Sequence, residues 1–264
     1  MLSSKKVEQY VQKIAANNVY MSSSVGVGGE KPDQYIYYEK MMDKSTRDDL
    51  INLLEHENTV VRAYALEGII DRGIAMDYFS LAKRYLYEYQ SVSILFGCIG
   101  GNRYIGDLFL EILIPKLNKN ELNDLESIVL QNPGKTVFAS TIIEKIQPDP
   151  KNYDLIRNLA KSKNRNALIK LAEFGKEQDF PLILSLKDPK DDDSLFDYFK
   201  AIKFYRSPKL KPELKLYSDN ILHSKEHYQN QWKFFYQAVA PYQDSFSKEI
   251  LNAPLKLKKK QRFT

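Results

Sequence analysis

The clearest hydrophobic pattern in the chain lies in residues 45–73, which read STRDDLINLLEHENTVVRAYALEGIIDRG. In the first half, Leu50, Leu53 and Leu54 fall at the i, i+3, i+4 spacing of an amphipathic helix. Ser45 stands in front of this run, and its hydroxyl can accept a hydrogen bond from a free first-turn amide. The pattern therefore predicts a short helix with Ser45 as its N-cap.

A second helix is expected after the polar turn His-Glu-Asn-Thr, with Thr59 as its cap. Val61, Ala65 and Ile69 follow one another at intervals of one helical turn. Gly73 stands just past the last turn, where glycine commonly ends a helix in the left-handed conformation. Two short helices with one apolar face each cannot enclose a core, so this pair requires neighbouring helices.

Apolar residues at helical spacing recur along the rest of the chain, separated by polar, glycine or proline gaps. The remaining expected helices cover residues 4–16, 32–42, 77–87, 92–98, 103–114, 121–130, 136–146, 153–160, 166–174, 180–186, 194–204, 213–222 and 230–239. A loop is expected between the first two of them. Because runs of Val, Ile and Thr at period two are not evident, no sheet is expected. The prediction is an all-α fold with a single helical-repeat domain over residues 1–253 and a basic, disordered tail over residues 254–264.

Around the polar turn, the pattern resembles a HEAT repeat through Leu53, Leu54, Val61, Arg62, Ala65, Ile69 and Gly73. The resemblance implies an alpha-alpha superhelix, a HEAT/armadillo-like solenoid of antiparallel helix pairs. In that family the Val-Arg pair opens the second helix, and the arginine bonds to neighbouring repeats. Arg62 is therefore expected to be partly buried and paired, and its removal is expected to cost more stability than removal of Arg72, which is treated as a rim charge.

A wider resemblance links the chain to uncharacterised bacterial HEAT-repeat proteins. It is carried by Tyr20-Met21, Gly26-Val27-Gly28-Gly29, Gly97-Cys98-Ile99-Gly100 and Trp232. This resemblance implies no activity, metal or cofactor for the chain.

Charge changes the picture mainly at the C-terminus. The chain has 39 Lys and Arg against 34 Asp and Glu, and residues 254–264 contain five basic residues and no acidic one. Those five are Lys256, Lys258, Lys259, Lys260 and Arg262. The remaining body is neutral, so nucleic acid is not its expected partner, and any contact with nucleic acid or an anionic membrane is assigned to the tail.

The cysteine content and the lack of a long apolar run bear on where in the cell the protein is expected. Cys98 is the only cysteine, which excludes an intramolecular disulfide, and it is expected to be buried at a tight helix turn. No apolar run approaches the roughly 20 residues of a membrane span, and no signal peptide is evident at the N-terminus. The expected location is the cytoplasm, and the alternative is an exported protein without its signal sequence.

Two short motifs suggest chemistry without the context that it needs. His223, Glu226 and His227 fit H-x-x-E-H, a zinc-peptidase motif that also requires a third ligand and a mixed α/β fold. The glycine-rich residues 26–31 lack the spacing of a phosphate-binding loop, and no strand is expected before them. We interpret the first motif as accidental and the second as a linker, so neither a metal nor a cofactor is expected.

Aromatic residues and the glycine loop supply the candidate binding residues. These are Gly28, Gly29, Tyr35, Tyr37 and Tyr38, together with Arg62. Tyrosine suits protein interfaces because it is large, rigid and able to form hydrogen bonds. The leading hypothesis is a non-enzymatic scaffold or adaptor that binds another protein on a curved solenoid surface. Two alternatives stay open: a bacterial immunity protein that inhibits a toxin, and a HEAT-like DNA glycosylase or other DNA-binding repeat protein.

Overall fold

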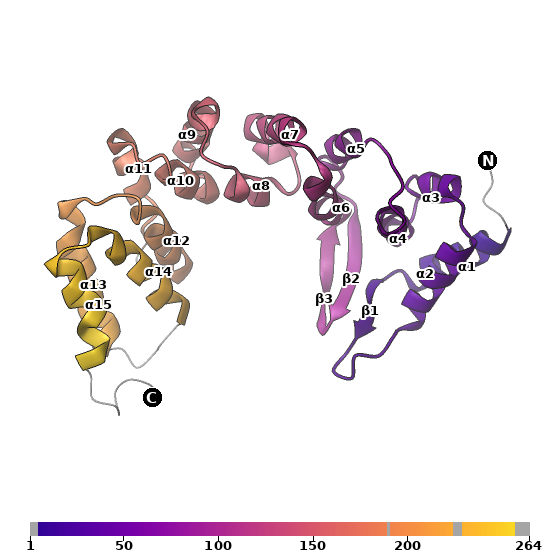
Figure 1. The fold of residues 1–264 in the computed structure, drawn as a ribbon, viewed down its shortest axis with the longest axis horizontal. Helices are drawn as coiled ribbons and strands as arrows, with labels where there is room; N and C mark the ends of the chain where they lie inside the picture. The colour runs from indigo at the N-terminus through magenta and orange to yellow at the C-terminus, as the bar shows by residue number, and fades with distance from the viewer. Residues whose placement is uncertain (1–4, 189–190, 224–228, 257–264) are drawn as a thin grey trace. The chain divides into compact units, whose positions relative to one another are not determined.

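A computed structural model describes residues 5–188, 191–223 and 229–256 of the chain. Its elements form two compact units, Met1–Ala139 and Ser140–Thr264, which we call unit 1 and unit 2 (Figure 1). Among the described residues, none of the helices combines the length and the apolar character that crossing a bilayer requires. The expectation of a single repeat domain over residues 1–253 stays a prediction.

Unit 1 combines helices with a small sheet. Its helices are α1 (Lys5–Asn17), α2 (Asp33–Lys44), α3 (Arg47–Leu53), α4 (Thr59–Asp71), α5 (Tyr78–Tyr85), α6 (Ile105–Leu113) and α7 (Lys119–Gln131). Its strands are β1 (Tyr20–Val25), β2 (Ser91–Gly97) and β3 (Ile99–Tyr104).

Unit 2 contains helices and 3-10 turns in its described part. The helices are α8 (Ala139–Lys145), whose first residue closes unit 1, α9 (Tyr153–Lys161), α10 (Arg165–Ala172), α11 (Phe180–Leu184), α12 (Asp192–Ile202), α13 (Lys211–His223), α14 (Gln229–Val239) and α15 (Ser245–Lys256). Proline starts or enters the 3-10 turns at Pro150, Pro208 and Pro241. The prediction of a mainly helical chain with proline at its turns is confirmed at these positions.

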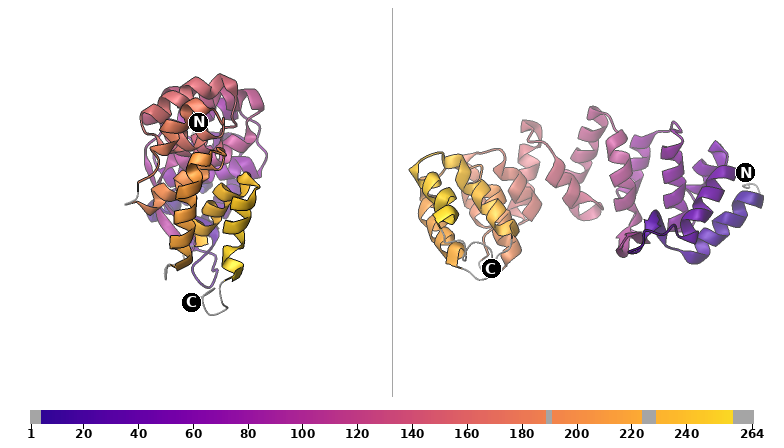
Figure 2. Two further views of the ribbon diagram at one scale, coloured as in Figure 1. Left: turned by 90° about the vertical axis from the view of Figure 1, so that its left-hand side faces the viewer. Right: turned by 60° about the horizontal axis from the view of Figure 1, so that its bottom comes forward.

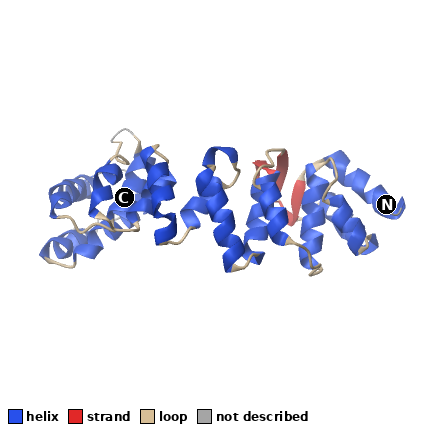
Figure 3. Cartoon of the chain, turned by 90° about the horizontal axis from the view of Figure 1, so that it is seen from above, coloured by secondary structure: helices blue, strands red, loops and turns tan. Residues whose placement is uncertain are grey.

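The expectation that the chain has no sheet is wrong. The strands form a three-stranded sheet in the order β1-β2-β3, with β1 parallel and β3 antiparallel to β2. Figure 3 shows this sheet in red among the helices of unit 1. Residues 92–98, expected to be helical, belong largely to β2, and β1 lies in the expected loop.

The sheet follows from a period-two pattern that serines and glycines obscure. Val92 and Ile94 alternate with Ser91 and Ser93, and both aliphatic side chains are buried. β2 and β3 form a hairpin whose two-residue turn is Gly97-Cys98. Gly97 has φ +58°, as the first position of a type II′ turn requires. Cys98 is therefore exposed in a hairpin turn and not buried at a helix turn.

The helix pair of residues 45–73 is present, with caps one residue away from those expected. Thr46 caps α3 in a reciprocal capping box with Asp49, and Asn58 caps α4. Ser45 instead ends α2, where its hydroxyl donates to the Met41 carbonyl oxygen at 2.8 Å. Gly73 has φ +60° and follows α4, as expected.

Helix α4 forms the centre of unit 1. Val60, Val61, Tyr64, Ala65 and Ile69 are all 0 % exposed, although they lie on different sides of the helix. The helix packs against α1, α3 and α6 and against strands β1 and β2. A helix that is apolar around its whole circumference is a buried core helix, and the other elements of unit 1 cover this one.

In unit 2 the helices pack in a regular sequence. α9 packs on α10, α10 on α12 and α12 on α14, while α13 packs on α15. The right-hand view of Figure 2 shows helices lying side by side within each unit. The even-numbered helices α10, α12 and α14 thus form a continuous row.

The burial of α4 predicts that enlarging Ala65 is costly. We expect Ala65→Leu to lower the free energy of unfolding by about 1–3 kcal/mol, because added methylene groups overpack a site with neighbours on every side. Ala16→Leu is the matched control, since Ala16 is exposed near the end of α1. Urea denaturation of both variants checks this, and equal midpoints would contradict the central position of α4.

Candidate functional site

A hollow surface in unit 2 runs along the row of even-numbered helices. Two adjoining hollows of about 510 and 440 Å³ share Asn166, Asp197 and Lys200. Their walls come from α8, α10, α12 and α14, together with residues next to those helices. We call this surface the groove. Its remaining lining residues are Ser140, Glu144, Asn164, Arg165, Ile169, Lys170, Glu173, Phe196, Lys203, Phe204 and Phe234.

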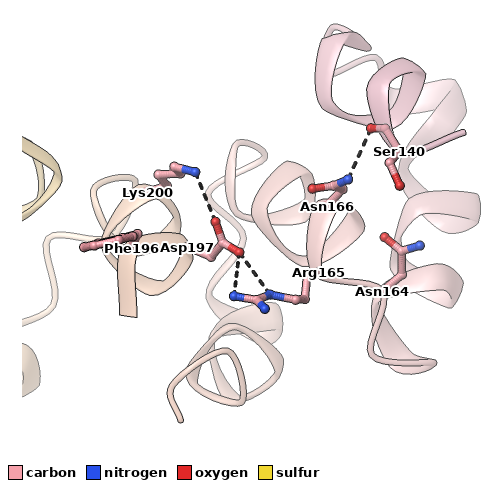
Figure 4. A pocket seen from close by; sticks show the side chains of 7 residues that line it. All are labelled: Ser140, Asn164, Arg165, Asn166, Phe196, Asp197 and Lys200. Carbon is pink, nitrogen blue, oxygen red and sulfur yellow. Dashed lines mark hydrogen bonds and ion pairs between the residues drawn. The ribbon is translucent and has the colours of Figure 1, made fainter. Parts of the chain in front are cut away.

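Asp197 organises the first hollow (Figure 4). The Arg165 Nε donates to Asp197 Oδ2 at 3.0 Å, and the Lys200 ammonium donates to Asp197 Oδ1 at 3.1 Å. Arg165 also reaches Asp191 at 3.2 Å. One carboxylate therefore joins α10 to α12, and the two cations keep their positions at the groove wall.

Two asparagines fix the start of α10 beside these charges. The Asn164 side chain accepts from the Ala167 N–H at 2.9 Å and caps the helix. Asn166 donates to the Ser140 carbonyl oxygen at 3.2 Å and so ties α10 to α8. The groove wall is thus built from side chains held by their own hydrogen bonds.

The second hollow combines aromatic rings with lysines. Lys170 is 5 % exposed, and both Glu173 carboxylate oxygens accept from it at 2.9 Å. The Lys200 Nζ lies 4.8 Å from the Phe234 ring centroid, and the Lys203 Nζ lies 4.9 Å from that of Phe204. Such contacts hold ammonium groups over ring faces.

Three phenylalanine rings give this part of the groove apolar surface. Phe204 is 39 % exposed, and the Phe196 and Phe234 ring centroids are 6.2 Å apart. Among the described lining residues, Lys203 differs from the other cations because its recorded contact is a ring and not a carboxylate. The arrangement can receive an apolar side chain beside an anionic group.

Charge is divided unequally between the two units. Residues 1–139 carry 15 Lys and Arg against 18 Asp and Glu, whereas residues 140–264 carry 24 against 16. The excess in unit 2 exceeds what the five basic tail residues supply. The neutral average of the body therefore conceals an acidic unit and a basic one, and the groove belongs to the basic unit.

Unit 1 contains a cluster of tyrosines and carboxylates that includes two predicted binding residues. Tyr38 stacks on Tyr64 with ring centroids 4.7 Å apart, and Tyr35 meets Tyr38 edge-on at 5.2 Å. The Tyr20 hydroxyl donates to Glu67 Oε2 at 2.8 Å, and the Tyr38 hydroxyl donates to Asp71 Oδ2 at 3.0 Å.

Burial dominates the electrostatics of this cluster. It raises the pKa of Glu67 to about 7, which the hydrogen bond from Tyr20 opposes and the nearby charge of Asp71 reinforces. Burial also raises the Tyr38 pKa, and the charges of Glu67 and Asp71 act in the same direction. Glu67 was not among the predicted binding residues. The feature that could have identified it is that it is the single carboxylate in an otherwise apolar turn of α4.

The other predicted binding residues do not join this cluster. Tyr37 receives the Lys13 ammonium 5.0 Å from its ring centroid. Gly28 and Gly29 lie exposed in the turn after β1, where Val25 and Glu30 form an isolated antiparallel bridge. A strand thus precedes the glycine loop, contrary to expectation.

Arg62 belongs neither to the tyrosine–carboxylate cluster nor to the glycine loop. It is 5 % exposed, its Nη1 lies 3.4 Å from Glu88 Oε2, and its Nη2 donates to Gln90 Oε1. It therefore joins α4 to the segment in front of β2 and is not available to a partner. The expected burial and pairing of Arg62 are confirmed.

Several predicted residues lie outside the described side chains. Glu226 and His227 of the H-x-x-E-H motif fall in residues 224–228, and His223 is described only as the last residue of α13. Of the basic tail, Lys256 is described only as the end of α15, while Lys258, Lys259, Lys260 and Arg262 lie outside the described residues.

Comparison of the chain with protein-family models, with curated proteins and with solved structures gives no match. The assignment of function therefore rests on the residues and geometry given above.

The raised Glu67 pKa predicts a pH-dependent contribution to stability. The folded protein holds this proton up to pH of about 7, whereas an unfolded glutamate releases it near its ordinary value of 4.5. Stability is therefore lost as the pH rises between these values, by roughly 1–3 kcal/mol. Glu67→Gln keeps an acceptor for Tyr20 without the charge, and it should be more stable than wild type above pH 7 by that amount.

Chemical denaturation of both proteins at pH 5 and pH 8 measures this difference. Glu30→Gln serves as the control, since Glu30 is exposed. A Glu67→Gln variant with the same pH dependence as wild type would show that the carboxyl titrates normally.

The position of Arg62 predicts a large effect of its removal. Arg62→Ala should lower the free energy of unfolding by about 2–4 kcal/mol, because it leaves Glu88 and Gln90 without their partner. Arg47→Ala should cost less than about 1 kcal/mol, because the Arg47 side chain is 61 % exposed and its contacts with Asp48 at 3.5 Å and with the Ala75 carbonyl oxygen at 3.4 Å are long and lie at the surface. Thermal melting compares the two variants, and equal melting temperatures would make Arg62 an ordinary surface charge.

Arg72 cannot serve as that control. Its guanidinium donates to the Ser45 carbonyl oxygen at 2.7 Å and to the Met42 carbonyl oxygen, so it caps the end of α2. Arg72 is exposed, as expected of a rim charge, but these two bonds give it a structural contact, and the lower cost of removing it compared with Arg62 stays a prediction.

Proposed function

We propose that the chain is a non-enzymatic, protein-binding helical-repeat protein and that the groove of unit 2 holds an extended segment of its partner. The observation that carries this proposal is the lining of the groove by successive even-numbered helices. In a stack of antiparallel helix pairs, one helix of each pair lines the same face, and that face binds extended ligands. The finer HEAT-like solenoid architecture and a protein partner belong to this same proposal.

The lining supports a segment that carries an apolar residue next to an acidic one. Phe204, Phe196 and Phe234 supply aromatic surface, and aromatic side chains are enriched where interfaces gain most of their energy. Lys203 supplies an ammonium beside Phe204, and the basic excess of unit 2 favours approach of an acidic partner.

The groove also favours recognition over covalent chemistry. Its described ionisable lining residues are arginine, lysines and carboxylates, and four of them neutralise one another in pairs: Lys170 with Glu173, and Lys200 with Asp197. Paired charges of this kind hold side chains in place and present hydrogen-bonding groups at the surface. DNA binding is the second candidate function, because the basic excess of unit 2 would also attract phosphates.

A displayed library of random peptides, selected on the whole chain, tests the proposal. We expect one class of enriched peptides to combine acidic and apolar residues. Lys203→Glu should weaken their binding about tenfold, because it places a second negative charge against the peptide carboxylate. Lys209→Glu makes the same charge change at an exposed position that is not part of the groove lining, and it should leave affinity within about twofold.

A second measurement separates the two candidate functions. If duplex DNA binds to the chain at physiological salt, Lys203→Glu should leave that binding unchanged. The protein-binding proposal would be replaced by nucleic-acid binding if two results came together. Lys203→Glu would have to remove salt-sensitive DNA binding, and no selected peptide would have to lose affinity in that variant.

A further inference from the structure

The three-stranded sheet of unit 1 has a surface unlike the rest of the chain. Residues 20–29 and 91–102 contain no Asp, Glu, Lys or Arg, in a chain that is 28 % charged. Serine, glycine and aliphatic residues take their place. The one charged residue of the three strands is Arg103 in β3, and its guanidinium is paired with Glu111 of α6 at 2.8 Å. Depletion of charge distinguishes the cores of protein interfaces from the rest of a protein surface.

The two edges of this sheet differ in how their outward-facing main-chain groups are covered. At the β1 edge, the Tyr64 hydroxyl donates to the Met21 carbonyl oxygen at 2.9 Å and accepts from the Met21 N–H at 3.0 Å. The outward-facing main-chain groups of Met21 are therefore satisfied by a side chain from α4. The opposite edge is β3, and Ile99, Gly100, Gly101 and Asn102 are all exposed there.

The hairpin geometry shows which groups of β3 face outward. A two-residue turn closes on a hydrogen-bonded pair, here Phe96 and Ile99, and such pairs recur at every second residue of the ladder. The Ile105 N–H donates to the Gln90 carbonyl oxygen at 2.8 Å. The alternation of hydrogen-bonded and non-hydrogen-bonded pairs therefore continues unchanged to the end of the hairpin. Gly100 and Asn102 therefore direct their N–H and C=O groups away from β2.

Side chains leave this edge accessible. An added Cβ would meet nothing within 4 Å at Gly101, and at Gly100 it would make an ordinary 3.5 Å contact with Leu95 Cδ1. Apolar surface flanks the strand, because Ile99 is 74 % exposed at one end and Tyr104 is 48 % exposed at the other. Natural proteins usually protect an exposed edge with charge, proline or a covering element.

We propose that the β3 edge binds an extended, uncharged segment of a partner protein as a fourth strand. Main-chain groups supply the hydrogen bonds, and Ile99 and Tyr104 supply apolar contacts at the two ends. The segment is uncharged because residues 91–102 offer no opposite charge to a side chain that loses water there. This inference concerns unit 1 and is independent of the groove.

A single extended segment fits this edge better than a second copy of the chain does. β3 ends at Tyr104 and α6 begins at Ile105, without a linker between them. A second copy pairing through its own β3 would have to bring its α6 alongside the first. An extended peptide has no attached helix to accommodate.

The experiment uses two substitutions at one residue. Peptides are selected from a displayed random library on the whole chain, synthesised, and measured on Gly100→Pro and Gly100→Ala. Proline removes the outward N–H of Gly100 without breaking the bonds between β2 and β3, whereas alanine adds the Cβ and keeps the N–H. We expect selected uncharged peptides to bind Gly100→Pro at least about tenfold more weakly and Gly100→Ala within about twofold.

Methylated peptides give a second readout that needs no protein variant. Methyl groups placed on alternate peptide amides should abolish binding in one phase and spare it in the other, because only one set of amides faces β3. The absence of any selected peptide with this alternation would overturn the proposal. A concentration-dependent dimer that Gly100→Pro dissolves would also overturn it, in favour of a second copy.

Discussion

The complete burial of one helix is the constraint on which unit 1 depends. The side chains of α4 are apolar around almost its whole circumference, so the helix is stable only when other elements cover it from every side. Helices α1, α3 and α6 supply part of that cover, and strands β1 and β2 supply the rest. The sheet is therefore part of the shell around α4, which explains why strands occur in a chain with an otherwise helical pattern.

The few polar side chains of α4 then hold the sheet in place. Tyr64 closes the free edge of β1, Glu67 accepts from Tyr20 at the start of the same strand, and Arg62 bonds to Gln90 just before β2. Each of these groups is largely buried, and each would be costly without its partner. The helix thus closes the β1 edge of the sheet with its own side chains, and β3 is the opposite edge.

The helical part of the fold could be predicted because helix signals are local. Leu50, Leu53 and Leu54 fix one face of α3 within a single turn, and Gly73 ends α4 by its own conformational freedom. The cap of α3 lies one residue after the expected Ser45, because Thr46 forms the reciprocal box with Asp49 while the Ser45 hydroxyl bonds back to Met41 at the end of α2. The strands could not be predicted in the same way, since β1 is YMSSSV and its pairing with β2 joins residues more than 70 positions apart.

The candidate sites show the same division between local and distant information. Tyr35 and Tyr38 were identifiable from composition, but the shifted pKa of Glu67 arises from burial by segments that the sequence does not place together. The groove depends on the spacing of whole helices, so Phe204 and Lys203 had no local signal beyond that of ordinary helix residues.

The net charge of the whole chain also hid a difference in charge between the two units. The neutral body combines an acidic unit, whose sheet carries Arg103 as its one charged residue, with a basic unit that carries a groove of lysines and aromatic rings. A surface without charge selects partners by main-chain hydrogen bonds and apolar contact, which depend little on salt. A surface with lysines attracts acidic partners at long range, and salt weakens that attraction. The two surfaces therefore differ in how ionic strength would affect their binding, which allows them to be distinguished in the intact protein.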